Sequence, residues 1–371
     1  MTPETAIIPH ADPVALPAPV WLLQALLLFT FILHVVPMSM VLGGGFWAIV
    51  ASRRGRESAP LAGLAIHLGH WLPVWTAAAI TTGVATLLFL QVLYGQLFYP
   101  AGVAMAWPWL SVIVILLVGY YAYYIRSLRR DKQPELARAA GIIGWLSFLV
   151  IGFLYVNVMT LMLRPDRITA SLLVESRGLA LNFGEAMLWP RYVHMVLGAV
   201  AVSSLWIAVR GAWQMGQKDV GGATLVRFAA RGFLGTTLAQ VAVGIWFLFA
   251  LPETAWRLLV GGDALGTTYL VLAVLLAFDA AWILWRAADS VVPMRQVIVA
   301  AVHLGVVVLL MVLIRDLVRR TMIAGVISWQ TMTVAPQWDV IAIFFVLLFL
   351  GLATLGWMLL AVRRADARRR G

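Results

Sequence analysis

Long apolar runs separated by short polar connections dominate this chain of 371 residues. Nine runs are long enough to cross a hydrocarbon core of about 30 Å as helices. Their approximate limits are 20–50, 72–98, 106–126, 140–163, 191–213, 229–251, 267–286, 295–314 and 338–362. The pattern predicts an all-α integral membrane protein with about nine transmembrane helices. Residues 1–19 are expected to form a flexible extension, and residues 20–371 a single polytopic membrane domain.

Basic residues are divided unequally between the two sets of connections. One set, together with the C-terminal tail, holds 19 Lys and Arg residues, and the other holds eight. Cytoplasmic loops carry an excess of Lys and Arg, so the first set is predicted to be cytoplasmic and the N-terminus to lie outside. The two long outer connections, 164–190 and 315–337, are expected to contain surface helices or re-entrant segments. The expected location is a bacterial inner (plasma) membrane.

Composition narrows the chemistry that is open to the chain. Hydrophobic residues make up 63% of it and charged residues 12%, and the net charge is +11. Because the arginines cluster in short loops, the positive charge has a topological cause and predicts no nucleic-acid partner. The chain has no cysteine, which excludes disulfides, thiolate metal sites and covalently attached c-type haem in this chain. Redox chemistry would therefore need histidine or methionine ligands.

One histidine lies near the middle of the first apolar run, in the stretch FILHVVPMSMVLGGGFW over residues 31–47. An ionisable side chain at membrane depth is costly and usually has a function or a partner. We interpret His34 as a haem-iron ligand, within a helical cage that holds the macrocycle. The alternative is a histidine packed in the core for structural reasons.

A second histidine follows Pro190 and Arg191 at the start of the fifth run. Proline suits the first turn of a helix, so His194 is expected about one turn inside the outer surface, with Arg191 close enough to pair with a haem propionate. His34 is expected to lie deeper, which favours two haems stacked in depth over one shared haem. The alternative for His194 is a hydrogen bond to a backbone carbonyl at the helix start.

The eighth run supplies a third candidate, His303, which is expected at a depth comparable with that of His34 and could equally be structural. Methionine can be a sixth haem ligand, although it more often fills gaps in packing. The methionines in the outer half or the outer loops are Met38, Met40, Met187, Met195, Met322 and Met332.

Three further ionisable groups have open interpretations. His67 and His70, spaced i and i+3, are a ligand pair, a proton entry or an interfacial pair, and the interfacial pair is favoured. Asp279 lies inside the seventh run and either takes part in proton uptake or pairs with Arg286 two turns on.

Four segments, in their order along the chain, resemble subunit I of the cytochrome bd-type oxygen reductases. They are HVVPMSMVLGGGFWAIV after Leu33, GVATLLFLQVLYG over 83–95, YVHMVLGAVAV around His194, and RRTMIAGVISWQTMTVAPQWDVIAIFF over 319–345. The resemblance implies haem b groups with His34 and His194 on haem iron. Together with the other candidates, His303 on haem iron and Arg191 and Met322 beside the cofactor, it predicts one to three haems. It also implies an electron-transfer role in a membrane respiratory complex with other membrane subunits and lipid.

The chain departs from that family where oxygen and quinol chemistry are expected. Residues 106–125 contain no Asp or Glu, Gln91 replaces a glutamate, and the GRQPW motif is absent. The methionine expected near 267–269 is missing, and the quinol-binding loop is reduced to about 252–266. These departures indicate a c-type cytochrome or another partner as the electron donor or acceptor, and they speak against oxygen reduction. The alternatives are a cofactor-free membrane anchor and, less favoured, a transporter, which usually has paired repeats.

Overall fold

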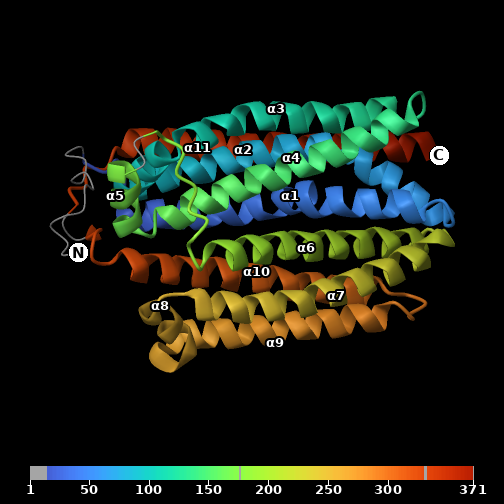
Figure 1. Cartoon of the computed structure of the whole chain (residues 1–371). Coiled ribbons are helices and arrows are strands. Elements are labelled where there is room, and N and C mark those ends of the chain that lie inside the picture. The colour runs from blue at the N-terminus through green and yellow to red at the C-terminus, as the bar shows by residue number, and fades with distance from the viewer. Residues whose placement is uncertain (1–14, 175–176, 330–331, 371) are drawn as a thin grey trace.

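The computed structural model describes residues 15–174, 177–329 and 332–370, and it consists of long helices that run side by side (Figure 1). Helices satisfy their backbone hydrogen bonds internally, as a hydrocarbon environment requires. The helices are α1 (Val20–Arg54), α2 (Ala59–Ala104), α3 (Ala106–Arg129), α4 (Pro134–Leu161), α5 (Pro165–Val174), α6 (Leu188–Gly216), α7 (Gly221–Ala250), α8 (Glu253–Arg257), the π-helical turn η2 (Leu258–Gly262), α9 (Ala264–Ala287), α10 (Met294–Ile323) and α11 (Trp338–Arg370).

Eight of these helices are long and apolar enough to cross a membrane: α1, α2, α3, α4, α6, α7, α9 and α10. The ninth predicted run lies in α11, where Trp338–Gly351 is apolar. The fold class predicted from sequence, an all-α multi-pass membrane protein, is confirmed. The four short turns α1–α2, α3–α4, α6–α7 and α9–α10 share one end of the bundle (Figure 1). We call this the basic end, and α5 and α8 lie at the opposite, outer end; the side of the membrane that each faces stays a prediction.

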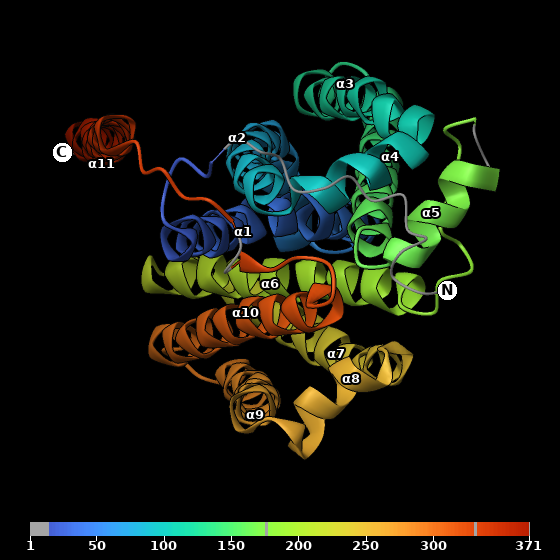
Figure 2. The same cartoon turned by 90° about the vertical axis from the view of Figure 1, so that its left-hand side faces the viewer.

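Two groups of four helices make up the bundle when it is viewed along its axis (Figure 2). One contains α1 to α4 and the other contains α6, α7, α9 and α10, and they meet along α1 and α6. Gly43 of α1 makes this contact close, because an added Cβ there would lie 2.1 Å from the carbonyl oxygen of Ala199. Ser203 Oγ also donates to the Ser39 carbonyl oxygen at 2.7 Å. Gly43 and Gly45 of the glycine triplet therefore serve helix packing, with Gly45 making room for the Tyr123 hydroxyl.

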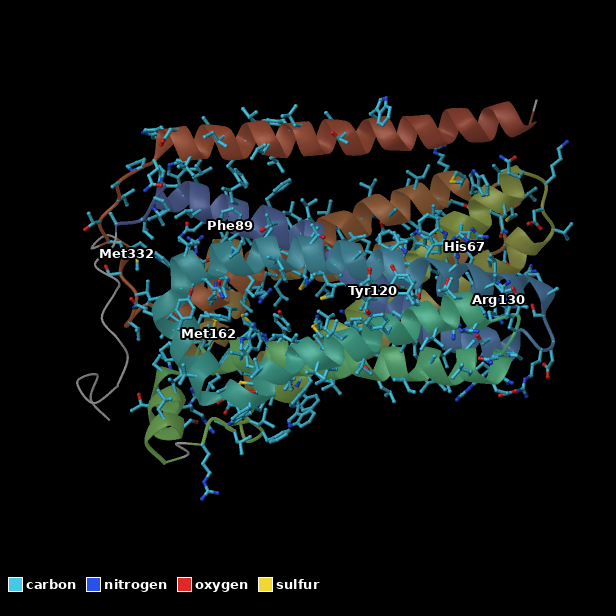
Figure 3. All side chains as sticks on the ribbon, turned by 90° about the horizontal axis from the view of Figure 1, so that it is seen from above. His67, Phe89, Tyr120, Arg130, Met162 and Met332 are labelled. Atoms are coloured by element: carbon cyan, nitrogen blue, oxygen red, sulfur yellow. The ribbon has the colours of Figure 1, made fainter. Side chains whose placement is uncertain are left out.

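Helix α11 stands apart from both groups along most of its length (Figures 2 and 3). Its outer end is tied to the start of the chain by backbone hydrogen bonds. Leu16 donates to Thr333 at 2.8 Å, Ala335 donates to Leu16 at 3.0 Å, and Gln337 donates to Pro17 at 2.9 Å. Residues 15–17 are thus held in place, whereas residues 1–14 of the predicted flexible extension lie outside the described residues.

The two long outer connections differ in structure. Residues 164–190 contain the short helix α5, as one of the two alternatives predicted, and the buried carboxylate of Glu185 pairs with Arg164 at 2.6 Å and with Arg167 at 3.2 Å. The second connection is shorter than expected, because α10 continues to Ile323. Arg315, predicted to lie in a loop, is therefore part of a helix.

Candidate functional site

His34 projects from α1 against α2. Its Nδ1 lies 3.3 Å from Thr82 Oγ1. The ring also lies against Gly83, where an added Cβ would come within 2.8 Å of the His34 Cε1 atom. Glycine at this position lets the imidazole approach the α2 backbone, so the ring orientation depends on the absence of a side chain there.

His194 projects from the second turn of α6 against α7. An added Cβ at Gly244 would lie 3.5 Å from its Cε1 atom, an ordinary contact. The Phe247 ring lies 6.5 Å away between centroids. The His194 Nδ1 atom is buried and has no hydrogen bond of good geometry among the described residues, although the backbone of Gln240 lies close enough to interact with the ring. A buried nitrogen without a partner costs free energy, so this ring is a candidate for a bound group that supplies the missing interaction.

His34 and His194 lie at similar depth, and the expectation that His34 is deeper is wrong. Both α1 and α6 begin at the outer end and run in the same direction, but α6 begins further into the bundle (Figure 1). Gly43 packs between Ala199 and Ser203. His34 precedes Gly43 by nine residues, which is about 14 Å of helix, and His194 precedes Ala199 and Ser203 by about 8 and 14 Å. Helix register, which distance from the chain terminus does not reveal, sets the depth.

His303 belongs to a different part of the bundle. Its Nδ1 lies 3.0 Å from Oδ2 of Asp279, across the α9–α10 contact, and makes an ion-pair contact without hydrogen-bond alignment. The structure thus gives Asp279 a histidine partner that the sequence analysis did not consider. His303 precedes Arg315 by 12 residues, so it lies about 18 Å deeper than Arg315. It is not at the level of His34, contrary to expectation.

Four arginines gather toward the outer end around a single carboxylate. Asp316 pairs with both Arg319 and Arg320. Arg191 donates to the Met159 carbonyl at 3.3 Å and to Thr160 Oγ1 at 3.2 Å.

Arg315 completes this group, which we call the arginine cluster: Arg191, Arg315, Arg319 and Arg320, with Asp316. Arg191 and Arg319 are both close enough to Arg315 to act on it electrostatically. The cluster carries three more positive than negative charges. Asp316 and Arg319 are buried, and the Nε atoms of Arg319 and Arg320 have no hydrogen-bond partner among the described residues.

Aromatic rings connect the arginine cluster to the level of His34. The Arg315 guanidinium lies 4.2 Å from the centroid of Phe31, one helical turn before His34. The Arg319 guanidinium lies 4.4 Å from the ring of Tyr94. Both distances are within the range of cation–π attraction. Tyr94 lies at a kink in α2, with φ −129° and ψ 19°. It is fully buried.

Met322 is not beside either imidazole. It lies seven residues beyond Arg315, about 10 Å further toward the outer end, where it packs against the clusters that contain Met162 and Met187. Its role as a ligand stays a prediction, and the geometry does not bring it to His34.

His67 and His70 do not converge on a common point. His67 Nε2 lies 3.2 Å from Nη1 of Arg210, and the ring stacks on Trp206 at 5.4 Å. His70 lies edge-on to Trp71. Figure 3 shows His67 near the same end as Arg130, far from Met162. This arrangement speaks against a ligand pair, and the favoured interpretation, an interfacial pair, stays a prediction.

Sequence reasoning missed most of the arginine cluster. The charges of Arg315, Arg319 and Arg320 were assigned to a loop, because a charged run after an apolar segment usually indicates the end of a helix. The spacing contained the missing signal. Asp316 precedes Arg319 by three residues and Arg320 by four, and such pairs meet on one face of a helix.

Comparisons with known proteins identify the fold. No protein-family model matches the chain. A segment of 61 residues, 16% of this chain and 29% of the other protein, is 43% identical to glycerol-3-phosphate acyltransferase from Ruegeria sp. (strain TM1040). The chain thus spans less than a third of the length of that curated relative. The bd oxidase structure from Geobacillus thermodenitrificans aligns with a TM-score of 0.71 and 12% identity, over 92% of this chain and 97% of that one.

The class of protein follows from these findings: an all-helical multi-pass membrane protein with a bd oxidase-like fold. The resemblance stated from sequence is confirmed at the level of the fold. The residues present also fit a haem. No group of three His, Cys, Asp or Glu side chains converges as a metal site in the part of the chain that the structure describes. The buried His194 Nδ1 without a hydrogen-bond partner could meet a haem iron as an axial ligand, and the arginine cluster could pair with the two propionate carboxylates.

Proposed function

We propose that this chain is a haem b-carrying electron-transfer subunit of a bd-like respiratory complex in a bacterial inner membrane. The observation that carries the proposal is the arginine cluster, together with His34 and His194 at one depth beneath it. The fold shared with a bd oxidase chain supports the class of complex. Other membrane subunits and lipid are the expected partners.

Charge balance is the physical argument for an anionic cofactor. Arg191, Arg315, Arg319 and Arg320 share only Asp316 among the described residues. Buried charges are expected to be paired, because desolvation penalises an isolated charge by several kcal/mol. Two propionates would bring the excess of three positive charges close to neutrality. Arginine also binds carboxylates in a bidentate geometry, and the unpartnered Nε atoms of Arg319 and Arg320 are available for it.

The residues have distinct roles in this proposal. His34 and His194 are iron ligands, and Gly83 on the neighbouring helix orients the His34 ring. Arg191 and Arg315 orient the propionates, and their charges favour the reduced form of the cofactor. A bound haem supplies one-electron transfer, while the helices around it exclude water. His303 is a candidate ligand at a deeper level through Nε2. Ligating histidines commonly donate their other ring nitrogen to a carboxylate, and Asp279 lies 3.0 Å from Nδ1 of His303.

The electron partner that we propose is a c-type cytochrome or another redox subunit. The connection between α7 and α9 supports it, because this segment is only the compact pair α8 and η2, whose Ala255 and Leu259 are buried against α10. That leaves little chain for a separate quinol-binding loop. Helix α3 has no Asp or Glu, so oxygen reduction is not part of the proposal. Rapid mixing with a reduced c-type cytochrome or with a quinol would discriminate between these donors.

Haem content and absorption spectra test the proposal. The purified native complex is expected to give a pyridine haemochrome spectrum of haem b. His34→Ala and His194→Ala are each expected to lose part of the reduced-minus-oxidised signal, while the matched control His70→Ala keeps all of it. Arg315→Gln should keep its haem and titrate at a lower midpoint potential, because a positive charge near the iron is removed.

Two results would contradict this assignment. If both histidine variants keep the native spectrum, they are not the ligands. If the intact complex is stable and contains no haem in this chain, the alternative applies, namely a cofactor-free anchor subunit of a respiratory complex. The absence of acidic residues from α3 is the observation that favours this alternative.

A further inference from the structure

A separate cavity lies at the basic end, far from His34 and His194, where α1, α2 and α7 meet. Its volume is about 540 Å³. Phe46, Trp47 and Phe228 form an aromatic floor, and the Trp47 ring meets the other two edge-on with centroids 5.0 Å apart in each pair. The floor is held firmly, since Trp47 Nε1 donates to the Val200 carbonyl at 3.1 Å. Gly232 is also required, because an added Cβ would lie 2.6 Å from Trp47.

Three arginines surround this floor. Arg54 comes from the end of α1, and Arg227 and Arg231 come from one face of α7. All three are exposed, and none forms an ion pair among the residues that the structure describes. Arg54 has an aromatic contact instead, with its guanidinium 5.9 Å from the Phe228 centroid. Like charges four residues apart on a helix repel each other, so the arrangement of Arg227 and Arg231 favours an anion between them.

We propose that this cavity binds an anionic phospholipid, with its phosphate among the three arginines and its glycerol backbone and first acyl carbons on the aromatic floor. The depth agrees with a lipid headgroup. Arg54 follows the apolar run 20–50 by four residues, and Arg227 precedes the run 229–251 by two, so both lie at its boundary. Basic pockets between transmembrane helices are known to bind anionic headgroups.

The aromatic floor is the reason for proposing a lipid over a free phosphate. A small hydrated anion gains little from Phe46, Trp47 and Phe228, whereas burial of a CH₂ group on such a surface is favourable. The three arginines supply the preference for an anionic over a zwitterionic headgroup. This site is independent of the proposed haem function and can be tested in protein of any haem content.

Lipid binding can be measured by native mass spectrometry of delipidated protein in detergent, titrated with phosphatidylglycerol, phosphatidylcholine or inorganic phosphate. The test variant is Arg54→Gln/Arg227→Gln/Arg231→Gln. Its control, Arg53→Gln/Arg56→Gln/Arg129→Gln, removes the same charge at the same end without touching the cavity. Each basic group near an anionic lipid contributes a factor of about five, so the test variant should bind phosphatidylglycerol on the order of 100-fold more weakly than wild type. The control should bind it like wild type.

The remaining outcomes decide the proposal. Equal weakening in both triple variants would show general electrostatic attraction and overturn the site. Equal binding of phosphatidylcholine would overturn the role of the arginines, and competition by inorganic phosphate at the affinity of the lipid would show a phosphate site. If the test variant does not fold, the single substitution Arg231→Gln is measured instead. Its affinity for phosphatidylglycerol should fall about fivefold, and an unchanged affinity would refute the site.

Discussion

Replacing Gly43 by alanine is a direct test of how the two four-helix groups are joined. The added Cβ would lie 2.1 Å from the Ala199 carbonyl oxygen and 2.6 Å from Ser203 Oγ. An ordinary contact needs at least 3.4 Å, and the nearest atom belongs to the α6 backbone, which cannot rotate away. Helices α1 and α6 would have to move apart, which stretches the hydrogen bond from Ser203 to Ser39.

The expected change in the free energy of unfolding is the balance of two costs and one gain. Overpacking of a well-packed interior costs about 1–3 kcal/mol, and loss of a buried hydrogen bond costs about 1 kcal/mol. Alanine regains up to about 1 kcal/mol over glycine in a helix. We expect Gly43→Ala to lower the free energy of unfolding by about 1–3 kcal/mol, measured by equilibrium denaturation in mixed micelles.

The next residue provides the control. An added Cβ at Gly44 would meet the Met40 terminal methyl at 3.5 Å and one methyl each of Leu68 and Leu72 at 4.0 Å, all ordinary contacts. Gly44→Ala should therefore be neutral or stabilising by up to about 1 kcal/mol. Equal free energies of unfolding for the two variants would refute the argument that Gly43 sets the distance between α1 and α6.

Two further predictions concern the site and the outer connection. Gly83→Ala should displace the His34 ring and lower haem occupancy, because the added Cβ would lie 2.8 Å from Cε1. The control Gly244→Ala, whose added Cβ would lie 3.5 Å from His194, should keep the wild-type absorption spectrum. Equal spectra for the two variants would show that His34 is not a haem ligand. In the outer connection, Arg164 binds Asp166 through two hydrogen bonds of 2.9 and 3.1 Å, which lower the pKa of Asp166 below its ordinary value. A lowered pKa contributes stability that is present above the unfolded-state pKa of about 3.9 and is lost as the pH falls through the folded-state value. Asp166→Asn should then lower the free energy of unfolding at pH 7 by under about 1 kcal/mol, since the pair is partly exposed. Thermal unfolding at decreasing pH should show the stability difference between wild type and variant disappearing below pH about 3.9. A stability difference that grows on acidification would contradict this assignment.

Hydropathy predicted the helices well, because a chain in hydrocarbon has few alternatives to a helix. Interior and surface of the bundle were harder to assign. Tyr123 belongs to a tyrosine-rich stretch near the end of the run 106–126, a position typical of interfacial residues, yet it is fully buried and donates to the Val41 carbonyl at 3.0 Å. Arg126 is the last residue of that run, yet it is buried and donates to the Ala48 carbonyl. Both side chains extend from α3 to backbone carbonyls of α1, and no local sequence pattern marks them as buried.

The candidate site was predicted in its residues and not in its geometry. His34 and His194 were found because a histidine in an apolar run is rare and costly. Their common depth depends on contacts between residues about 160 positions apart, such as Ser39 with Ser203. The continuation of α10 through Arg315 and Arg320 was missed because its charges are partly neutralised only within the folded helix.

The crossing at Gly43 also affects how the protein is made. Helices α1 to α4 are synthesised first, and α6 is the first helix of the second group to follow. Because α6 supplies the Ala199 and Ser203 contacts itself, docking of the second group onto the first can begin before α7, α9 and α10 have left the ribosome. Domains tend to fold in the order of synthesis. A defect at this crossing would therefore expose unpaired helices to membrane proteases during translation, and the loss of protein would exceed what the free energy of unfolding of the finished chain predicts.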